Sequence, residues 1–187
     1  VDASIGGKTG INFNGLKNEI GVFSPAEYVL LDTEFLKTLD TRNLLSGYAE
    51  MLKHGIISTE SHWAELLKFD INHIDYEELK RLVAQSVQIK EDIVEQDPFE
   101  KGIRKALNVG HTVGHAFESL ALELNQHVLH GYAVAWGIVC ELYHSYLKVG
   151  FPKDKLRQTV QFIKENYGVF AIDCKQYDRL YEFMTHD

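Results

Sequence analysis

The pattern of apolar and polar positions predicts a mostly helical chain. From about Thr41 onward, apolar residues recur every three to four positions, as they do on one face of a helix. This spacing predicts helices over Asn43–Ile57, Ser61–Lys68, Tyr76–Glu95, Lys105–Leu122, Gly131–Val149, Lys153–Tyr167 and Tyr177–Met184. Pro98 and Pro152 fall between these segments, where residues that break helices belong.

The first 40 residues have a different pattern. They contain the glycines Gly6, Gly7, Gly10, Gly15 and Gly21, which favour loops. One apolar and partly β-branched run, Tyr28–Asp32, predicts a strand. The predicted fold class is mainly α, with a short β-containing lead-in over residues 1–42 and a helical domain over residues 43–187.

Composition narrows the possible functions. The 187 residues are 45% hydrophobic, as in an ordinary globular protein, and the net charge of −8 argues against general nucleic-acid binding. Cys140 and Cys174 form no Cys-x-x-Cys pair or disulfide framework, which favours a reducing, cytoplasmic setting. The most apolar run, Ala133–Cys140, is too short for a membrane span, and the first residues lack the pattern of a signal peptide. The chain begins with Val1 instead of Met, so we expect an excised piece of a longer protein.

Lys90 is a candidate binding residue because it lies on the apolar stripe of the predicted helix Tyr76–Glu95. A lysine on such a stripe either extends its ammonium to solvent or meets an anion. Both interpretations stay open from this helix alone.

A polar stripe follows on the next predicted helix, if that helix reaches back to Arg104. At about 100° per residue, the stripe contains Arg104, Asn108, His111, His115 and Glu118. It is either a solvated face or a functional site. Gly110 and Gly114 lie beside it, and glycines inside a helix are typical of places where another backbone or a ligand comes close.

Histidines and a carboxylate suggest a metal site. His111 and His115 are four residues apart, so both could reach one ion, although Thr112 replaces the glutamate of the zincin motif. His130, at the entry to a very apolar helix, is a third candidate, and Glu50 could supply the carboxylate. The alternative for Glu50 is an exposed ion pair with Lys53. The remaining histidines are expected to be surface or packing residues: His54, His62, His73, His127, His144 and His186.

The segment Gly6–Thr9 is similar to the tail of a P-loop but lacks that motif's first glycine. It could still present backbone N–H groups and the Lys8 ammonium to a phosphate.

Taken together, several segments resemble the 3-dehydroquinate synthase family in both order and spacing. They are Asp2–Asn12, Gly15–Asn18, Gly47–Lys53, Leu107–Glu118 and Leu129–Gly131. The resemblance implies the C-terminal, metal- and substrate-binding part of a lyase that uses NAD and zinc or another divalent metal such as cobalt. The family converts 3-deoxy-D-arabino-heptulosonate 7-phosphate into 3-dehydroquinate and phosphate, in the shikimate pathway.

The same resemblance implies roles for individual residues. The metal ligands would be Glu50, His111 and His130. His115 would transfer protons, and Lys53, Lys90 and Arg104 would contact the substrate. The phosphate end would be held by Lys8, Asn18 and Asn108. The residues bordering NAD would be Asp2, Lys8, Lys17, Phe35, Leu36, Lys37 and Thr38.

The resemblance also implies partners and limits. We expect a small sugar phosphate as substrate, no nucleic acid or membrane partner, and a homodimer in the full-length protein. The family has a nucleotide-binding domain before Asp2 and a phosphate-contacting lysine beyond Asp187, so we expect this chain alone to be inactive. The alternatives are another sugar-phosphate cyclase, which the set Lys90, Arg104 and Asn108 disfavours, and a non-catalytic helical binding module.

Overall fold

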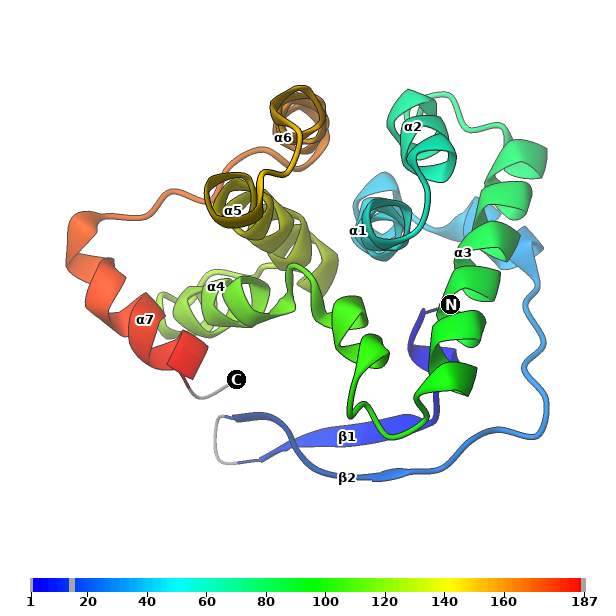
Figure 1. The fold of residues 1–187 in the computed structure, drawn as a ribbon, viewed down its shortest axis with the longest axis horizontal. Coiled ribbons are helices and arrows are strands. Elements are labelled where there is room, and N and C mark those ends of the chain that lie inside the picture. The colour runs from blue at the N-terminus through cyan, green and yellow to red at the C-terminus, as the bar shows by residue number, and fades with distance from the viewer. Residues whose placement is uncertain (1, 14–15, 186–187) are drawn as a thin grey trace.

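The fold is a helical assembly with a small hairpin at one side (Figure 1). The computed structural model describes residues 2–13 and 16–185, with residues 2, 12 and 16–19 described by their backbone alone. The hairpin comprises β1 (Lys8–Phe13) and β2 (Leu16–Phe23). The α-helices are α1 (Thr41–Ile57), α2 (Glu60–Lys68), α3 (Tyr76–Gln96), α4 (His111–Glu123), α5 (His130–Val149), α6 (Lys153–Tyr167) and α7 (Tyr177–Thr185). Short 3-10 helices are η1 (Asp2–Ser4), η2 (Thr33–Thr38), η3 (Ile103–Asn108) and η4 (Cys174–Gln176).

Helix α5 occupies the centre of the assembly (Figure 1). It packs against α1, α4 and α6, while α1 also contacts α2 and α3, and α4 contacts α7. Its residues Val134, Ala135 and Ile138 are fully buried in the main core. Within the described residues, no helix is both long enough and apolar enough to cross a membrane.

Local sequence signals explain where several helices begin. The side chains of Asp40, Thr59 and Asp75 accept hydrogen bonds from backbone N–H groups in the first turns of α1, α2 and α3. Gly150 ends α5 with φ of 76°, a left-handed conformation that glycine adopts without strain. The prediction of a mainly α fold with a short β-containing lead-in is confirmed, and α6 has the predicted bounds.

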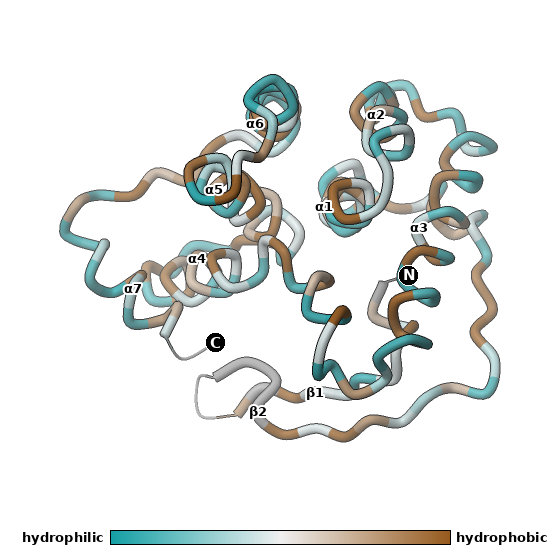
Figure 2. The backbone as a smooth tube through the Cα atoms, in the orientation of Figure 1, coloured by the Kyte–Doolittle hydropathy of each residue, from teal (hydrophilic) through white to brown (hydrophobic). Residues whose placement is uncertain are grey.

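The predicted strand over Tyr28–Asp32 is wrong. The sheet of the lead-in is the antiparallel hairpin β1–β2, whose strands are separated in sequence by Asn14 and Gly15. Asn-Gly between two short runs is a strong hairpin signal, and it was overlooked in favour of local apolarity. Leu30 is 95% exposed. Figure 2 shows hydrophobic colouring along this outer connection between β2 and η2.

The predicted helix over Lys105–Leu122 is also wrong over its first six residues, before α4. Residues Ile103–Asn108 form η3, and α4 begins only at His111. Gly110 interrupts the helix with φ of 82°, so the polar stripe cannot run continuously back to Arg104. The break gives the residues before it an orientation independent of α4.

Candidate metal centre and active site

Three side chains from three helices meet at one point. Glu50 of α1 places Oε1 3.4 Å from Nε2 of His111 and 3.3 Å from Nε2 of His130. His111 begins α4 and His130 begins α5. The prediction that this carboxylate and these two imidazoles could reach a common ion is therefore compatible with the geometry.

The spacing of these atoms suits a zinc-sized ion. Ligand atoms about 2.0–2.1 Å from a tetrahedral zinc ion lie about 3.3–3.4 Å from one another. The Glu50–His111 and Glu50–His130 separations, 3.4 and 3.3 Å, have this length. They are longer than ordinary N–H···O hydrogen bonds. Two histidines and one carboxylate also form a common ligand set of catalytic zinc sites, with a position left for substrate.

The other ring nitrogen of each histidine has its own acceptor. Nδ1 of His111 lies 3.3 Å from the carbonyl oxygen of Val109, and Nδ1 of His130 lies 2.9 Å from Oε2 of Glu118. A proton on Nδ1 leaves Nε2 to face Glu50, as a metal ligand requires. Glu118 was noted in the polar stripe but was not predicted to act in the site.

Glu50 also forms a buried ion pair. Its Oε2 lies 2.5 Å from Nζ of Lys53, and Lys53 is only 2% exposed. The alternative of an exposed Glu50–Lys53 pair is therefore wrong. Burial opposes ionisation of Glu50, but its interactions with the His111 and His130 rings and the charge of Lys53 hold its pKa well below the usual range.

His130 has a strong preference for positive charge. Burial alone would lower the pKa of His130, but its hydrogen bonds to Glu118 and Glu50 raise it to about 9. A cation bound by Glu50 and His130 would take the place of this positive charge between the two carboxylates.

Glycines bring the three helices close enough for these side chains to meet. A Cβ on Gly131 would overlap the carbonyl oxygen of Ser46 in α1, and the Gly131 N–H donates to the Ser46 hydroxyl at 3.0 Å. A Cβ on Gly114 would stand 3.1 Å from the carbonyl oxygen of Ala133 in α5. Close backbone approach, the reason suggested by the sequence for Gly110 and Gly114, is confirmed. The contribution of Gly131 was not foreseen.

His115 lies next to the three converging side chains. Its ring centroid is 5.5 Å from that of His111 and 5.8 Å from that of His130. Atoms of His115, Glu118 and His130 also form a second group that could hold an ion. The structure thus places His115 beside the candidate centre.

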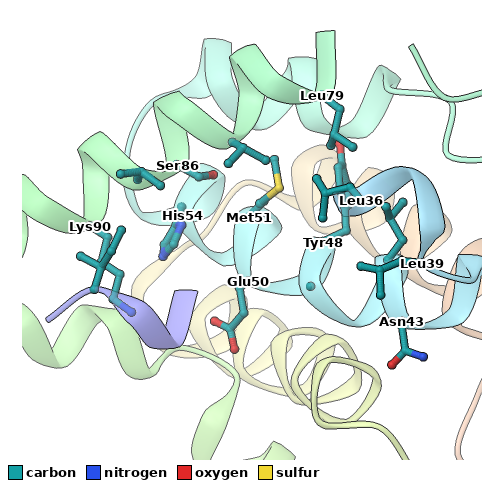
Figure 3. Close-up of a pocket in the computed structure, with 15 residues that line it drawn as sticks. Leu36, Leu39, Asn43, Tyr48, Glu50, Met51, His54, Leu79, Ser86 and Lys90 are labelled. Atoms are coloured by element: carbon teal, nitrogen blue, oxygen red, sulfur yellow. The ribbon is translucent and has the colours of Figure 1, made fainter. Parts of the chain in front are cut away.

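A cavity of about 320 Å³ adjoins the same carboxylate. Figure 3 shows Glu50, His54 and Lys90 at one end and Leu36, Leu39 and Leu79 at the other. Lys90 is 9% exposed, so it is buried at the cavity wall instead of reaching into solvent. His54 and His62 are buried, and His54 also lines this cavity with Glu50 and Lys90.

Arg104 is held by the main chain. Its guanidinium donates to the carbonyl oxygens of Pro98 at 2.6 Å and Gly6 at 2.7 Å, and it lies 5.6 Å from the centre of the Phe23 ring. These contacts connect the hairpin to the segment between α3 and η3. The guanidinium therefore has two protein acceptors in this structure, and its predicted contact with substrate stays a prediction.

Lys8 and Asn108, which were predicted to hold the substrate phosphate, both contact the carboxylate of Glu100. Glu100 forms an ion pair with Lys8 and accepts a hydrogen bond from Asn108 at 2.5 Å. Burial raises the pKa of Glu100, but hydrogen bonds from Lys8 and Asn108 outweigh this effect and lower it. Glu100 was missed because nothing in its sequence spacing distinguishes it from an exposed loop residue.

The residues predicted to border NAD lie in different surroundings. The side chains of Asp2, Lys17 and Asn18 lie outside the described part of the structure. Leu36 lines the cavity. Phe35 is 73% exposed and lines a second cavity with Leu31 and Asp32, whereas Lys37 pairs with Glu34 at 2.7 Å. Thr38 donates to the carbonyl oxygen of Phe35 at 3.0 Å.

Comparison with family models accounts for the whole chain. Residues 47–187 match the model for the 3-dehydroquinate synthase C-terminal domain, and residues 1–46 match the N-terminal one. The chain belongs to the 3-dehydroquinate synthase family. The segments that carry the resemblance lie within these matched ranges, and Glu50, His111 and His130 lie in the C-terminal one.

Curated relatives support the same assignment. A 3-dehydroquinate synthase of Parabacteroides distasonis is 59% identical over 187 residues, covering 100% of this chain and 53% of that protein. One of Streptococcus pyogenes is 44% identical over 161 residues, covering 86% of this chain and 44% of that protein. The chain thus spans about half the length of these 3-dehydroquinate synthases.

Solved structures share the fold at lower identity. A 2-epi-5-epi-valiolone synthase of Streptomyces hygroscopicus, with NAD+ and Zn2+ bound, has a TM-score of 0.85 at 23% identity and covers 99% of this chain and 52% of its own. A 2-deoxy-scyllo-inosose synthase, complexed with carbaglucose-6-phosphate, NAD+ and Co2+, has a TM-score of 0.81 at 23% identity and covers 100% and 52%. These likenesses establish a 3-dehydroquinate synthase-like fold.

Proposed function

We propose that the full-length protein is a 3-dehydroquinate synthase that eliminates phosphate from 3-deoxy-D-arabino-heptulosonate 7-phosphate and closes the carbocycle. The observation that carries the proposal is the convergence of Glu50, His111 and His130 in a chain that matches both domain models of that family. NAD and a divalent metal would be its cofactors, and a small sugar phosphate its substrate.

The metal centre would be built by Glu50, His111 and His130. A metal held there would polarise substrate hydroxyl groups as a Lewis acid. Glu50 contributes the anionic ligand, since its low pKa keeps it ionised. Lys53 balances the second carboxylate oxygen at 2.5 Å and borders the position where substrate would meet the metal.

His115 would accept and return protons at the substrate. The centroid of its ring lies 5.5 Å from that of His111, and His115 is not a member of the group formed by Glu50, His111 and His130. A base in this position could take the proton of a polarised hydroxyl while NAD, when bound, supplies a hydride acceptor. The ketone formed in this way would acidify the neighbouring C–H and allow phosphate to leave.

Cations at the other side of the site would bind the substrate's anionic groups. Lys90 and Arg104 would hold its carboxylate or nearby oxygens, and Lys8, Asn18 and Asn108 its phosphate. Lys90 and Arg104 are both buried, which strengthens their interaction with an anion. The segment from Phe35 to Thr38, with Asp2, Lys8 and Lys17, would border NAD.

We infer the same organisation for the whole protein that the sequence suggested. Residues 1–42 would complete the nucleotide-binding domain, and residues 43–187 would form the metal- and substrate-binding domain. The protein would act as a homodimer in the cytoplasm.

Substrate assays of the full-length protein test the proposal. We expect phosphate release from 3-deoxy-D-arabino-heptulosonate 7-phosphate that requires NAD and is lost on chelation of metal. Phosphate release from an uncarboxylated sugar phosphate instead would identify a different cyclase. No turnover of any sugar phosphate, together with no stoichiometric metal, would identify a non-catalytic module. Residues 1–187 alone are expected to show no turnover.

A further inference from the structure

Glu118 contacts His130 on the side of the ring opposite to Glu50. Oε2 of Glu118 lies 2.9 Å from Nδ1 of His130, whereas Oε1 of Glu50 lies 3.3 Å from Nε2. The Glu118 side chain is 12% exposed and the His130 side chain 43%, so the carboxylate is the less exposed partner of this contact. One imidazole is thus placed between two carboxylates from different helices.

We propose that Glu118 is the positioning residue of the metal centre. Its carboxylate accepts the Nδ1 proton of His130 and holds the ring with Nε2 directed at the ion bound by Glu50 and His111. The inference rests on the metal site of the proposed function and adds to it a residue outside the ligand set.

The two distances distinguish a positioning role from a ligand role. A separation of 2.9 Å is typical of a charge-assisted hydrogen bond. It is shorter than the roughly 3.3 Å expected between two ligands of one zinc ion. His130 belongs to both candidate ligand groups, but only its Glu50 side has the longer spacing. Glu118 therefore acts as an acceptor for the ring and Glu50 as its co-ligand.

His111 and His130 differ in their exposure and in the acceptor that holds the Nδ1 side of the ring. The His111 side chain is 15% exposed, and its Nδ1 faces the neutral carbonyl group of Val109 at 3.3 Å. The His130 side chain is 43% exposed at the start of α5, and its Nδ1 faces a charged carboxylate at 2.9 Å. A charged acceptor restrains the ring more firmly than a neutral carbonyl group and makes it a stronger donor to a metal.

The Glu118 carboxylate also lies close to the proposed proton-transfer residue. Ligand atoms of His115, Glu118 and His130 are all within 4.8 Å of one another. Glu118 follows His115 by three residues on α4, so both project from the same side of the helix. Loss of this carboxylate would thus disturb the metal ligand and its neighbour together.

Metal affinity of the full-length protein tests the role of Glu118. We would measure the Kd for Zn2+ by chelator competition, and the Co2+ absorption spectrum, for wild type, Glu118→Gln, Glu118→Asp and Glu118→Ala. We expect Zn2+ affinity to fall by roughly 10-fold in Glu118→Gln, which keeps an acceptor oxygen, and by up to roughly 100-fold in Glu118→Ala. The Co2+ spectrum should shift, because the ring orientation changes.

Glu123→Gln is the matched control, since it makes the same change on the same helix. Glu123 pairs with Arg179 of α7 and takes no part in the metal centre. We expect wild-type metal affinity from it. Zn2+ affinities within twofold of wild type in folded Glu118→Gln and Glu118→Asp, with an unchanged Co2+ spectrum, would overturn the inference.

Two further outcomes separate this inference from the proposed function. Complete loss of metal in every Glu118 variant, as expected for Glu50→Ala, would make Glu118 a ligand and overturn its positioning role while leaving a metal enzyme. Wild-type protein that binds no metal at all would overturn the metal centre itself, and the role of Glu118 with it.

Discussion

The two ends of the candidate site are built in different ways. At the metal end, Oε1 of Glu50 lies 3.4 Å from Nε2 of His111 and 3.3 Å from Nε2 of His130. At the anion end, Lys8 is paired with Glu100, and Arg104 donates to main-chain carbonyl groups. In the proposed function, the metal end would be preorganised, and the anion end would exchange its protein partners for substrate oxygens.

The difference follows from the elements that carry the residues. The proposed metal ligands come from α1, α4 and α5, whose backbones approach closely at glycines. Lys8 comes from a hairpin strand and Glu100 from the connection between α3 and η3, where it adopts φ of 58°. Helices in contact fix a geometry, while a hairpin and a loop can change theirs at lower cost.

The largest effect should come from breaking the buried pair at the metal end. Glu50→Ala leaves the Lys53 ammonium buried without its partner, which costs about 3–5 kcal/mol in the free energy of unfolding. Chemical denaturation of metal-free protein measures this loss. Glu50→Ala/Lys53→Met should recover most of it, and an equal loss in both variants would contradict the importance of the charge.

A smaller effect is expected where α5 crosses α1. Gly131→Ala places a Cβ against the Ser46 carbonyl, so we expect a loss of about 1–3 kcal/mol in the free energy of unfolding and weaker Zn2+ binding. Gly47→Ala is the matched control, because a Cβ there meets nothing within 4 Å. It should be neutral or stabilise α1 by up to about 1 kcal/mol. Similar losses in both variants would show that contact at the crossing does not matter.

The smallest effect concerns the anion end. Glu100→Gln removes a charge that competes for Lys8, so inorganic phosphate should bind the full-length protein about 2–5-fold more tightly, as expected from about 0.5–1 kcal/mol per exposed ion pair. Calorimetric titration measures the change. Glu91→Gln, at an exposed position of α3, is the control. Unchanged or weaker phosphate binding in Glu100→Gln would make the anion end preorganised too.

The sequence predicted helices far better than the lead-in, for a physical reason. Long amphipathic segments such as Lys153–Tyr167 bury one face, so the spacing of their apolar residues predicts the helix and the face that packs. Tyr28–Asp32 has the composition of a strand but no strand partner in the described part of the chain. The helix over Lys105–Leu122 was overextended, because its periodicity does not reveal the left-handed conformation of Gly110.

The candidate site was predicted by resemblance more than by residue spacing. Spacing alone paired His111 with His115, whereas the structure brings His111 together with His130, 19 residues away on α5. The family segments suggested the trio Glu50, His111 and His130, whose ligand atoms lie within 4.8 Å of one another in the structure. Glu118 and Glu100 act through contacts between separate elements, and a single sequence carries no signal for such contacts.

The glycine crossings have a consequence for which ions the protein can use. Because Gly131 rests on the main chain of Ser46 and Gly114 on that of Ala133, the three ligand-bearing helices have little freedom to spread apart. Ions with ligand distances near 2.0–2.1 Å, such as Zn2+, suit this narrow frame. Ca2+, whose oxygen ligands lie about 2.3–2.6 Å away and number six or more, would need a wider and more oxygen-rich shell. In the proposed centre, selection by ionic size would thus depend on residues that never touch the ion.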